Sequence, residues 1–249
     1  MAEGNEARAE QGEWQARVDL AACYRLIALH GWDDLIATHI SARVPGTEDF
    51  LINRLGLTFE EITASNLVRV NLAGEVTDGS GAQINPAGFT IHSAIHAARE
   101  DVGCVIHCHT DDGVAVSALA EGLLPLNQLS MLIRHDIAFH DYEGVALDPG
   151  ERARLQADLG ERNIMLLRNH GTLVVGRTVA EAYTRIYFLE RACTMQVRTL
   201  GMGRPLHPAS EAAQAATRRL GQGDFMAFAP LTFDAARRRV ARAMPGFDE

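Results

Sequence analysis

Two short apolar segments carry histidines with the spacing of metal ligands. His107 and His109 stand at the end of the run Gly103–Thr110. Alternate side chains of a β-strand share one face, so the two imidazoles are expected to point the same way. Imidazoles at the open end of a buried strand bind divalent metals well. A third ligand is expected from His170, which closes another apolar strand, so we predict a metal site made of these three histidines.

The elements that position these residues follow from hydrophobic periodicity and cap signals. A helix is expected from Trp14 to His30, and a second one begins at Asn85-Pro86 and ends near Arg99. Asparagine accepts hydrogen bonds as an N-cap, and the missing N–H of proline does no harm in the first turn. The longest helix is expected to begin after Thr178 and to reach about Leu200.

Strands and helices alternate along the chain without an obvious linker, internal repeat or low-complexity segment. This alternation predicts one α/β domain with a mixed sheet over residues 14–249, with a C-terminal helical extension from about residue 201. Residues 1–13 are polar and offer few anchors for packing, so they are expected to form a flexible N-terminal tail.

Two other pairs of residues, one of two histidines and one of a histidine and an aspartate, could also carry chemistry. His92 and His96 are spaced i, i+4 and could form a helical metal pair, but no glutamate lies between them to act as a base. We interpret them as part of a packed helix face. His135 and Asp136 are adjacent, and adjacent side chains of an extended segment diverge, so they predict no His–Asp dyad. One of the pair can still reach a cleft, and His135 is kept as the candidate acid/base.

Composition excludes several classes of protein. The formal net charge is −9, and the short arginine run at 237–239 reads as a solvated helix face, so no nucleic acid is expected as a partner. No apolar stretch is long enough to span a membrane, and the N-terminus does not resemble a secretion signal. The four cysteines lack CxxC spacing, which favours a reducing cytoplasm.

Other catalytic devices are missing from the sequence. There is no GxSxG nucleophile elbow, and Gly79-Ser80-Gly81 lacks the rest of a phosphate-binding loop. The chain contains no lysine, so a Schiff-base mechanism has no candidate nucleophile. The histidines therefore remain as the residues that can carry chemistry.

These histidines and the segments around them resemble the class II aldolase/adducin family. The match extends from about Trp14 to Leu200 and is closer to the adducin-head branch than to the sugar-phosphate aldolases. The segments that carry it, in chain order, are His30–Trp32, Thr38–Val44, Ile62–Val68, Gly88–Arg99, Val105–Thr110, Phe139–Tyr142, Leu167–Gly171 and Gln196–Leu200.

The resemblance implies a three-layer α/β/α sandwich around a mixed, mainly antiparallel sheet. It also implies that His107, His109 and His170 bind the metal, most often Zn²⁺ with Mn²⁺ or Fe²⁺ as alternatives. A homotetramer with active sites between subunits is implied as well. In the aldolases of this family the metal is a Lewis acid that stabilises the enediolate formed when a carbon–carbon bond breaks beside a carbonyl.

The chain departs from the sugar-phosphate aldolases at important positions. Their catalytic acid lies four positions before the helix histidine; here that histidine is His92, and the position holds Gly88. The segments that correspond to their phosphate pocket offer few donors, and Gln128 stands near the place of an expected tyrosine. A phosphorylated sugar is therefore not expected as substrate, and His39 and Gln128 are predicted to contact a different small molecule.

The sequence thus favours an enzyme. The expected function is a metal-dependent carbon–carbon lyase, an aldolase or a decarboxylase, that acts through a metal-stabilised enolate on a non-phosphorylated carboxylic or carbonyl substrate. The proton would come from His135, His39 or water. Two alternatives stay open: a non-haem iron oxygenase on the same three histidines, which also suit Fe²⁺, and a non-catalytic, adducin-like binding protein.

Overall fold

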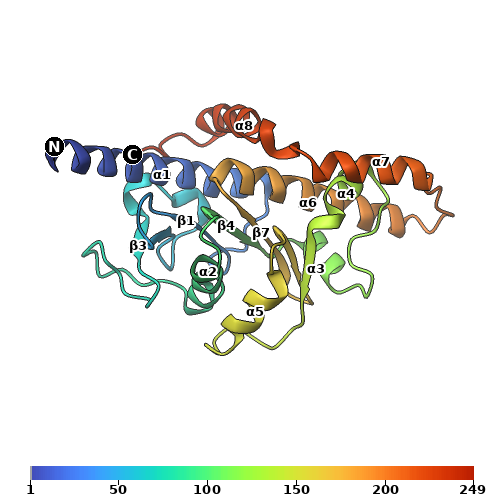
Figure 1. Cartoon of the computed structure of the whole chain (residues 1–249), viewed down its shortest axis with the longest axis horizontal. Coiled ribbons are helices and arrows are strands. Elements are labelled where there is room, and N and C mark those ends of the chain that lie inside the picture. Colours follow the sequence, from blue (N-terminus) through green and yellow to red (C-terminus); the bar gives the residue numbers. More distant parts are fainter. Residues whose placement is uncertain (1) are drawn as a thin grey trace.

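A seven-stranded sheet with the strand order β3-β2-β1-β4-β7-β6-β5 forms the centre of the computed structural model (Figure 1). The structure describes residues 2–249, with side chains from residue 8 onward. Neighbouring strands are antiparallel except β5 and β6, which are parallel. The strands are β1 (His39–Arg43), β2 (Phe50–Ile52), β3 (Val68–Val70), β4 (Cys104–Cys108), β5 (Ile137–His140), β6 (Ile164–Leu167) and β7 (Gly171–Gly176).

Helices cover both faces of this sheet, which confirms the expected three-layer α/β/α architecture (Figure 1). Helices α1 and α6 lie on one face, and α2 and α5 lie on the other. The α-helices are α1 (Ala2–His30), α2 (Pro86–Ala98), α3 (Asp111–Ser117), α4 (Gln128–Ile133), α5 (Glu151–Leu159), α6 (Val179–Gly201), α7 (Glu211–Gln222) and α8 (Ala229–Ala243). Four short 3₁₀ turns are η1 (Phe59–Glu61), η2 (Ala64–Asn66), η3 (Arg134–Asp136) and η4 (Phe225–Phe228).

The side chains of strand β4 alternate between the hydrophobic clusters on the two faces of the sheet. Cys104, Ile106 and Cys108 are buried in the cluster that contains residues of α1 and α6. Val105 is buried in the other cluster, with residues of α2 and α5. Because side chains alternate along a strand, His107 faces the same side as Val105. His107 therefore points toward the layer of α2 and α5.

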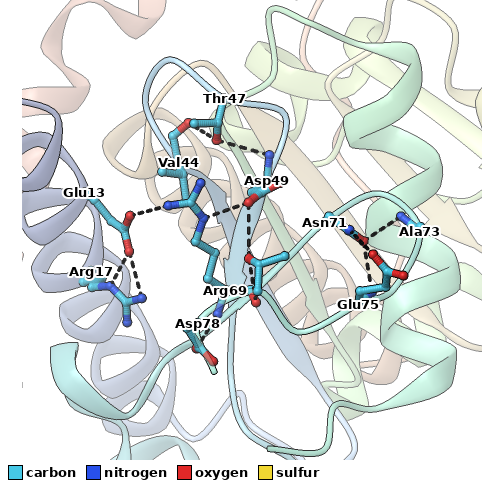
Figure 2. Close-up of polar contacts among 11 residues, drawn as sticks. Glu13, Arg17, Val44, Thr47, Asp49, Arg69, Asn71, Ala73, Glu75 and Asp78 are labelled. Atoms are coloured by element: carbon cyan, nitrogen blue, oxygen red, sulfur yellow. Dashed lines mark hydrogen bonds and ion pairs between the residues drawn. The ribbon is translucent and has the colours of Figure 1, made fainter. Parts of the chain in front are cut away.

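The N-terminal helix corrects the prediction of a flexible tail. Helix α1 begins at Ala2 rather than at Trp14, so most of the predicted tail is helical, and Met1 lies outside the described residues. Glu13 is anchored by two arginines, Arg17 in its own helix and Arg69 on β3, each at 2.8 Å (Figure 2). Arg69 also pairs with Asp49 at 2.8 Å. These contacts join α1 to the edge of the sheet, and local sequence patterns do not contain them.

The C-terminal residues after α6 pack against the main layers rather than apart from them. Phe233, Val240 and Phe247 are buried in the core cluster that α1 and α6 share. The backbone of Phe247 and Glu249 accepts hydrogen bonds from Ala64 and Ser65 at 2.9 Å. Helix α8 thus covers α1 and α6 from outside, as Figure 1 shows. Across the described residues, no helix combines the length and apolar character needed to cross a membrane.

Candidate metal centre

The turn between β6 and β7 brings the third histidine to the first two. Strand β4 pairs with β7, and His107 lies opposite Leu173. His170 precedes β7 in a tight turn, in which Asn169 has a φ of +58°. Asparagine tolerates this left-handed conformation better than most residues. A Cβ on Gly171 would lie 2.4 Å from the carbonyl oxygen of Cys108, so glycine permits the close approach of the turn to β4.

The three imidazoles converge on one point. Nε2 of His109 lies 2.8 Å from Nε2 of His107 and 3.0 Å from Nε2 of His170. One nitrogen of each ring lies within 4.8 Å of the others. This geometry agrees with the sequence prediction that His107, His109 and His170 form one cluster.

Hydrogen bonds on the outer nitrogens show that this cluster fits a metal ion. Nδ1–H of His107 donates to the backbone carbonyl of Thr172 at 3.0 Å, and Nδ1–H of His109 donates to Asp34 at 3.1 Å. Each neutral ring then presents a lone pair on Nε2, and two lone pairs at 2.8 Å cannot bond to one another. A cation between them removes this conflict. Carbonyl and carboxylate partners on the outer nitrogen are typical of metal-binding histidines.

Burial keeps the inner histidines neutral. Desolvation, followed by the nearby His109 and His170, holds the pKa of His107 well below its usual value. Desolvation, followed by His109 and His140, lowers the pKa of His170 to about 4. Neutral imidazole is the form that ligates metals. His109 and His170 are only partly buried, so one side of the cluster is open to a substrate.

His39 lies beside the cluster, and its role in substrate binding stays a prediction. It pairs with His107 across β1 and β4, and the two ring centroids are 5.1 Å apart. The His39 side chain is almost fully buried. Its Nδ1 shares a hydrogen bond of 2.8 Å with Nε2 of His92. His92, a residue of α2, therefore fixes the orientation of the His39 ring.

A buried hydrogen-bonded chain continues from His92 through the interior. Nδ1 of His92 lies 2.6 Å from the hydroxyl of Ser41, which lies 2.8 Å from Nε2 of His96. Nδ1 of His96 is buried without a hydrogen-bond partner among the described residues. Desolvation lowers the pKa of His92 well below its usual value and that of His96 to about 3. The two helix histidines are thus a packed face, as interpreted from the sequence.

The position of the His39 ring explains why residue 88 is a glycine. A Cβ at this position would lie 2.5 Å from Cδ2 of His39, closer than real Cβ contacts allow. The imidazole of His39 therefore fills the space into which a side chain on Gly88 would project. Gly88 and His39 therefore form a matched pair. Neither position, taken alone in the sequence, indicates this contact.

The structure does not bring the other two predicted site residues to the cluster. His135 lies in η3, where the adjacent Asp136 binds Asn163 just before β6 begins, whereas His170 follows the end of β6. His135 is thus at the opposite end of these strands and does not join the histidine cluster within one chain, and its catalytic role stays a prediction. Gln128 opens α4, which packs against α6 and α7, and its side chain is exposed away from the histidines.

Three residues near the cluster were missed by sequence reasoning. Asp34 lies in the loop before β1, and nothing in its local sequence indicates a partner for His109. His140 is buried at the end of β5, where Nδ1 lies 2.7 Å from Asp158 and Nε2 lies 3.4 Å from Glu151. Tyr142 follows, with its ring centroid 6.4 Å from that of His170. The run His140-Asp141-Tyr142 at a strand end was a usable signal for the last two.

Comparison with known proteins shows to which family the chain belongs. Residues 18–197 match the class II aldolase and adducin N-terminal domain family. The chain belongs to this family. A Caulobacter vibrioides protein, whose name marks it as an unproven class 2 aldolase, is 56% identical over 243 residues, which cover 96% of this chain and 94% of that protein. Mouse alpha-adducin is 46% identical over 195 residues, which cover 77% of this chain but only 26% of the adducin.

Solved structures agree with this assignment. An aldolase II superfamily protein from Pseudomonas syringae is 46% identical, covers 96% of both chains and superimposes with a TM-score of 0.90. L-fuculose 1-phosphate aldolase from Glaciozyma antarctica is 29% identical, covers 95% of this class II aldolase-family chain and 94% of its own, and has a TM-score of 0.80. The family therefore includes both a named aldolase and adducins.

Proposed function

We propose that this class II aldolase-family protein is a metal-dependent carbon–carbon lyase, either an aldolase or a decarboxylase. Its substrate would be a non-phosphorylated carboxylic or carbonyl compound. The observation that carries the proposal is the convergence of three imidazoles that are open on one side, with His107 oriented by Thr172 and His109 by Asp34. Three protein ligands with an open position are the arrangement of catalytic rather than structural metal sites.

A divalent ion at this site, most simply Zn²⁺, would act as a Lewis acid on a substrate oxygen and stabilise enolate character beside a carbonyl. The protein would orient the substrate and handle the proton. We assign the proton to His39, because its ring borders His107 and its Nδ1 is already held by His92. Among the described residues, no hydrogen bond engages its Nε2. Tyr142, with 56% of its side chain exposed, would line the entrance next to His170.

The contacts of Arg168 support a non-phosphorylated substrate. Arg168 is the cation closest in sequence to the cluster, but its guanidinium donates to the carbonyl oxygens of Ser117, Leu119 and Ala120. Its charge also lies 4.1 Å from the ring centroid of Phe139. A carboxylate or carbonyl oxygen would instead be bound by the metal itself.

The proposed protein is a homo-oligomer, in line with the tetramer implied by the family resemblance. The four cysteines are free and buried, which supports a reducing cytoplasm as its compartment. The adducin relatives favour a second candidate, a binding protein without catalysis. Fe²⁺ in place of Zn²⁺ would make the site an oxygenase, because three imidazoles suit both metals.

The test begins with metal analysis of protein purified without an affinity tag. We expect about one divalent ion per chain, its loss in His107→Ala, and retention in His207→Ala, where the substituted histidine is exposed in a distant loop. The wild-type protein is then assayed with 2-oxo-4-hydroxy acids and aromatic carboxylic acids. Zn²⁺, Mn²⁺ and Fe²⁺ are supplied in turn, with and without oxygen.

Cleavage or carbon dioxide release without oxygen, lost in His107→Ala, supports the lyase. Turnover that requires both Fe²⁺ and oxygen supports the oxygenase instead. A metal-free protein whose stability and activity are the same in wild type and His107→Ala would contradict both enzymes and favour the binding protein.

A further inference from the structure

A second cavity, separate from the metal centre, lies where the end of α1 meets α6 and α8. Its volume is about 370 Å³, and none of the three metal histidines lines it. These helices form the layer opposite α2 and α5, as Figure 1 shows, whereas His107 faces α2 and α5. A volume near 300–1,000 Å³ is typical of small-molecule sites.

Aromatic rings form one wall of this cavity. His30 stacks on Trp32 with ring centroids 4.4 Å apart and an interplanar angle of 24°. Tyr187 lies 5.5 Å from His30 and 5.9 Å from Trp32, again between centroids. Nε2 of His30 is 3.0 Å from the hydroxyl of Tyr183, which fixes the orientation of the imidazole. His30 and Trp32 are thus stacked, Tyr187 is tilted against both of them by 59° and 55°, and the three rings are held in place by contacts with one another.

Three arginines form the rim: Arg191 and Arg198 from α6, and Arg239 from α8. Within the described part of the chain, no ion pair or hydrogen bond engages their guanidinium groups, and no acidic residue lines the cavity. This gathering of free positive charge is unexpected in a chain with a net charge of −9. Burial, followed by the charges of Arg239 and Arg191, lowers the pKa of His30 to about 4, so its ring stays neutral.

A larger cavity elsewhere in the structure provides a contrast. Its volume is about 680 Å³, and it also contains arginines. There, however, Arg99 pairs with Asp101 at 2.7 Å, and Arg185 pairs with Glu181 at 3.3 Å. Those positive charges are already matched within the protein. The smaller cavity is the one with unmatched charge beside an aromatic wall.

We propose that this cavity binds a small aromatic anion, an aromatic ring with a carboxylate or a phosphate attached to it directly or through a short linker such as a sugar. The ring would pack against the wall of His30, Trp32 and Tyr187, which favours aromatic over saturated ligands. The anionic group would be held by the guanidinium groups, whose planar donors match carboxylate and phosphate oxygens. The site does not depend on the lyase proposal, because it shares no lining residue with the metal centre.

Trp32 reports directly on binding. The chain has two tryptophans, so Trp14→Phe leaves Trp32 as the single reporter. The full-length variant is titrated, with EDTA present to remove metal, with benzoate as the carboxylate probe and AMP as the phosphate probe. Cyclohexanecarboxylate and inorganic phosphate are the matched probes without an aromatic ring. We expect a saturable change in Trp32 fluorescence with benzoate, AMP or both, and affinities at least about tenfold weaker for the ringless probes.

Arg191→Ala and Arg239→Ala should each weaken aromatic-anion binding by about tenfold or more, because each removes a charge-assisted contact. Arg204→Ala is the matched control, since it removes the same charge from an exposed loop and should leave affinity unchanged. His107→Ala should bind like the parent. Calorimetry checks the stoichiometry of one ligand per chain.

Several results would overturn the proposal. These are no saturable signal with either aromatic probe, equal affinity for the ringless probes, or equal losses in Arg204→Ala and Arg191→Ala. Loss of binding in His107→Ala would place the ligand on the metal histidines instead. A Trp32 signal that follows protein concentration rather than ligand would mean that a second copy of the chain fills the cavity.

Discussion

Asp34 holds His109 through a single hydrogen bond of 3.1 Å, and 49% of the Asp34 side chain is exposed. His107, in contrast, is oriented by the backbone carbonyl of Thr172, which no side-chain substitution removes. The two histidines therefore differ in how easily their orientation can be disturbed. The carboxylate of Asp34 is the point at which the metal centre can be weakened without changing a ligand.

Asp34→Asn should lower the affinity for Zn²⁺ by about 10- to 100-fold, the usual cost of losing a partner behind a metal-binding histidine. The affinity is measured by competition with a chelator. Asp33→Asn serves as control, because it removes the same charge one residue away. Equal losses in both variants would show that only the general negative charge near the site matters.

The packing of Gly88 against His39 makes a second prediction at this scale. Gly88→Ala should destabilise the protein by about 1–3 kcal/mol, because an added methyl group overlaps the imidazole in a fully packed interior. Adding His39→Ala should reverse part of this loss, since the ring is then gone. Denaturant unfolding gives the free energy of unfolding of the wild type, the two single variants and the double variant, which together form a double-mutant cycle.

Gly12→Ala is the comparison for that cycle. Gly12 is also helical, but its Cβ would be 3.8 Å from the nearest atom, an ordinary contact. Alanine should therefore be neutral there or stabilise the helix by up to about 1 kcal/mol. If the losses of Gly88→Ala and His39→Ala simply add, the two residues are not a matched pair.

At the scale of elements, α6 is tied to the ends of β4 and β7 by one buried carboxylate. The hydroxyls of Thr110 and Thr172 both donate to Glu190. Thr110 in turn caps α3 by accepting from the N–H of Gly113 at 2.9 Å. Glu190 thus connects the helix to the two segments that carry the metal histidines. Burial raises its pKa to about 7, even though the two threonine hydrogen bonds act in the opposite direction.

The raised pKa of Glu190 determines the direction in which the stability of the fold changes with pH. Between the ordinary value of 4.5 and the folded value of about 7, the folded chain holds a proton at Glu190 that the unfolded chain has released. Folding is therefore favoured at the acid end, and the contribution of Glu190 falls as the pH rises through this window. The loss between pH 5 and pH 8 should be on the order of 2 kcal/mol.

Glu190→Gln cannot ionise and should remove that part of the pH dependence. Denaturant unfolding of wild type and variant at pH 5, 6.5 and 8 gives the difference directly. Glu211→Gln is the control, because it changes an exposed carboxyl group in the first turn of α7 and should leave the dependence as in wild type. If the difference in unfolding free energy between wild type and Glu190→Gln does not vary with pH, Glu190 is not the source of the pH dependence.

At the scale of the whole molecule, exposed apolar side chains flank the open side of the metal centre. Leu35 and Val145 are 74% and 69% exposed and belong to the loops that carry Asp34 and Tyr142. Leu35 also has a φ of +48°, a left-handed conformation that costs a non-glycine residue about 1–2 kcal/mol. Exposed apolar surface beside a site is typical of an interface between subunits.

The protein is therefore expected to be an oligomer by size-exclusion chromatography with light scattering. Val145→Asp should lower the assembled fraction, because it places a charge on the interface. Leu231→Asp is the matched control: Leu231 is 73% exposed on α8, away from the site. A monomeric wild type, or equal effects of both substitutions, would argue against this interface.

The sequence by itself determined which three histidines come together and the class of fold, because both depend on local order. The alternation of His107 and His109 along one strand needs no information about the rest of the chain, and His170 could be joined to them from its own strand end and family motif. The caps at Asn85 and Thr178 are local for the same reason, and the structure confirms both. The family comparison agrees with the resemblance carried by these segments.

Only the tertiary structure decided what surrounds those histidines. The chain from His39 through His92 and Ser41 to His96 exists because α2 packs over β1, and separations of 51–55 residues hide such contacts from any local pattern. The separation of His135 from the cluster could not be predicted, because its local sequence does not tell which end of the sheet it occupies. The helical N-terminus was missed because the anchor of Glu13 is Arg69, 56 residues away. Contacts distant in sequence are set by packing.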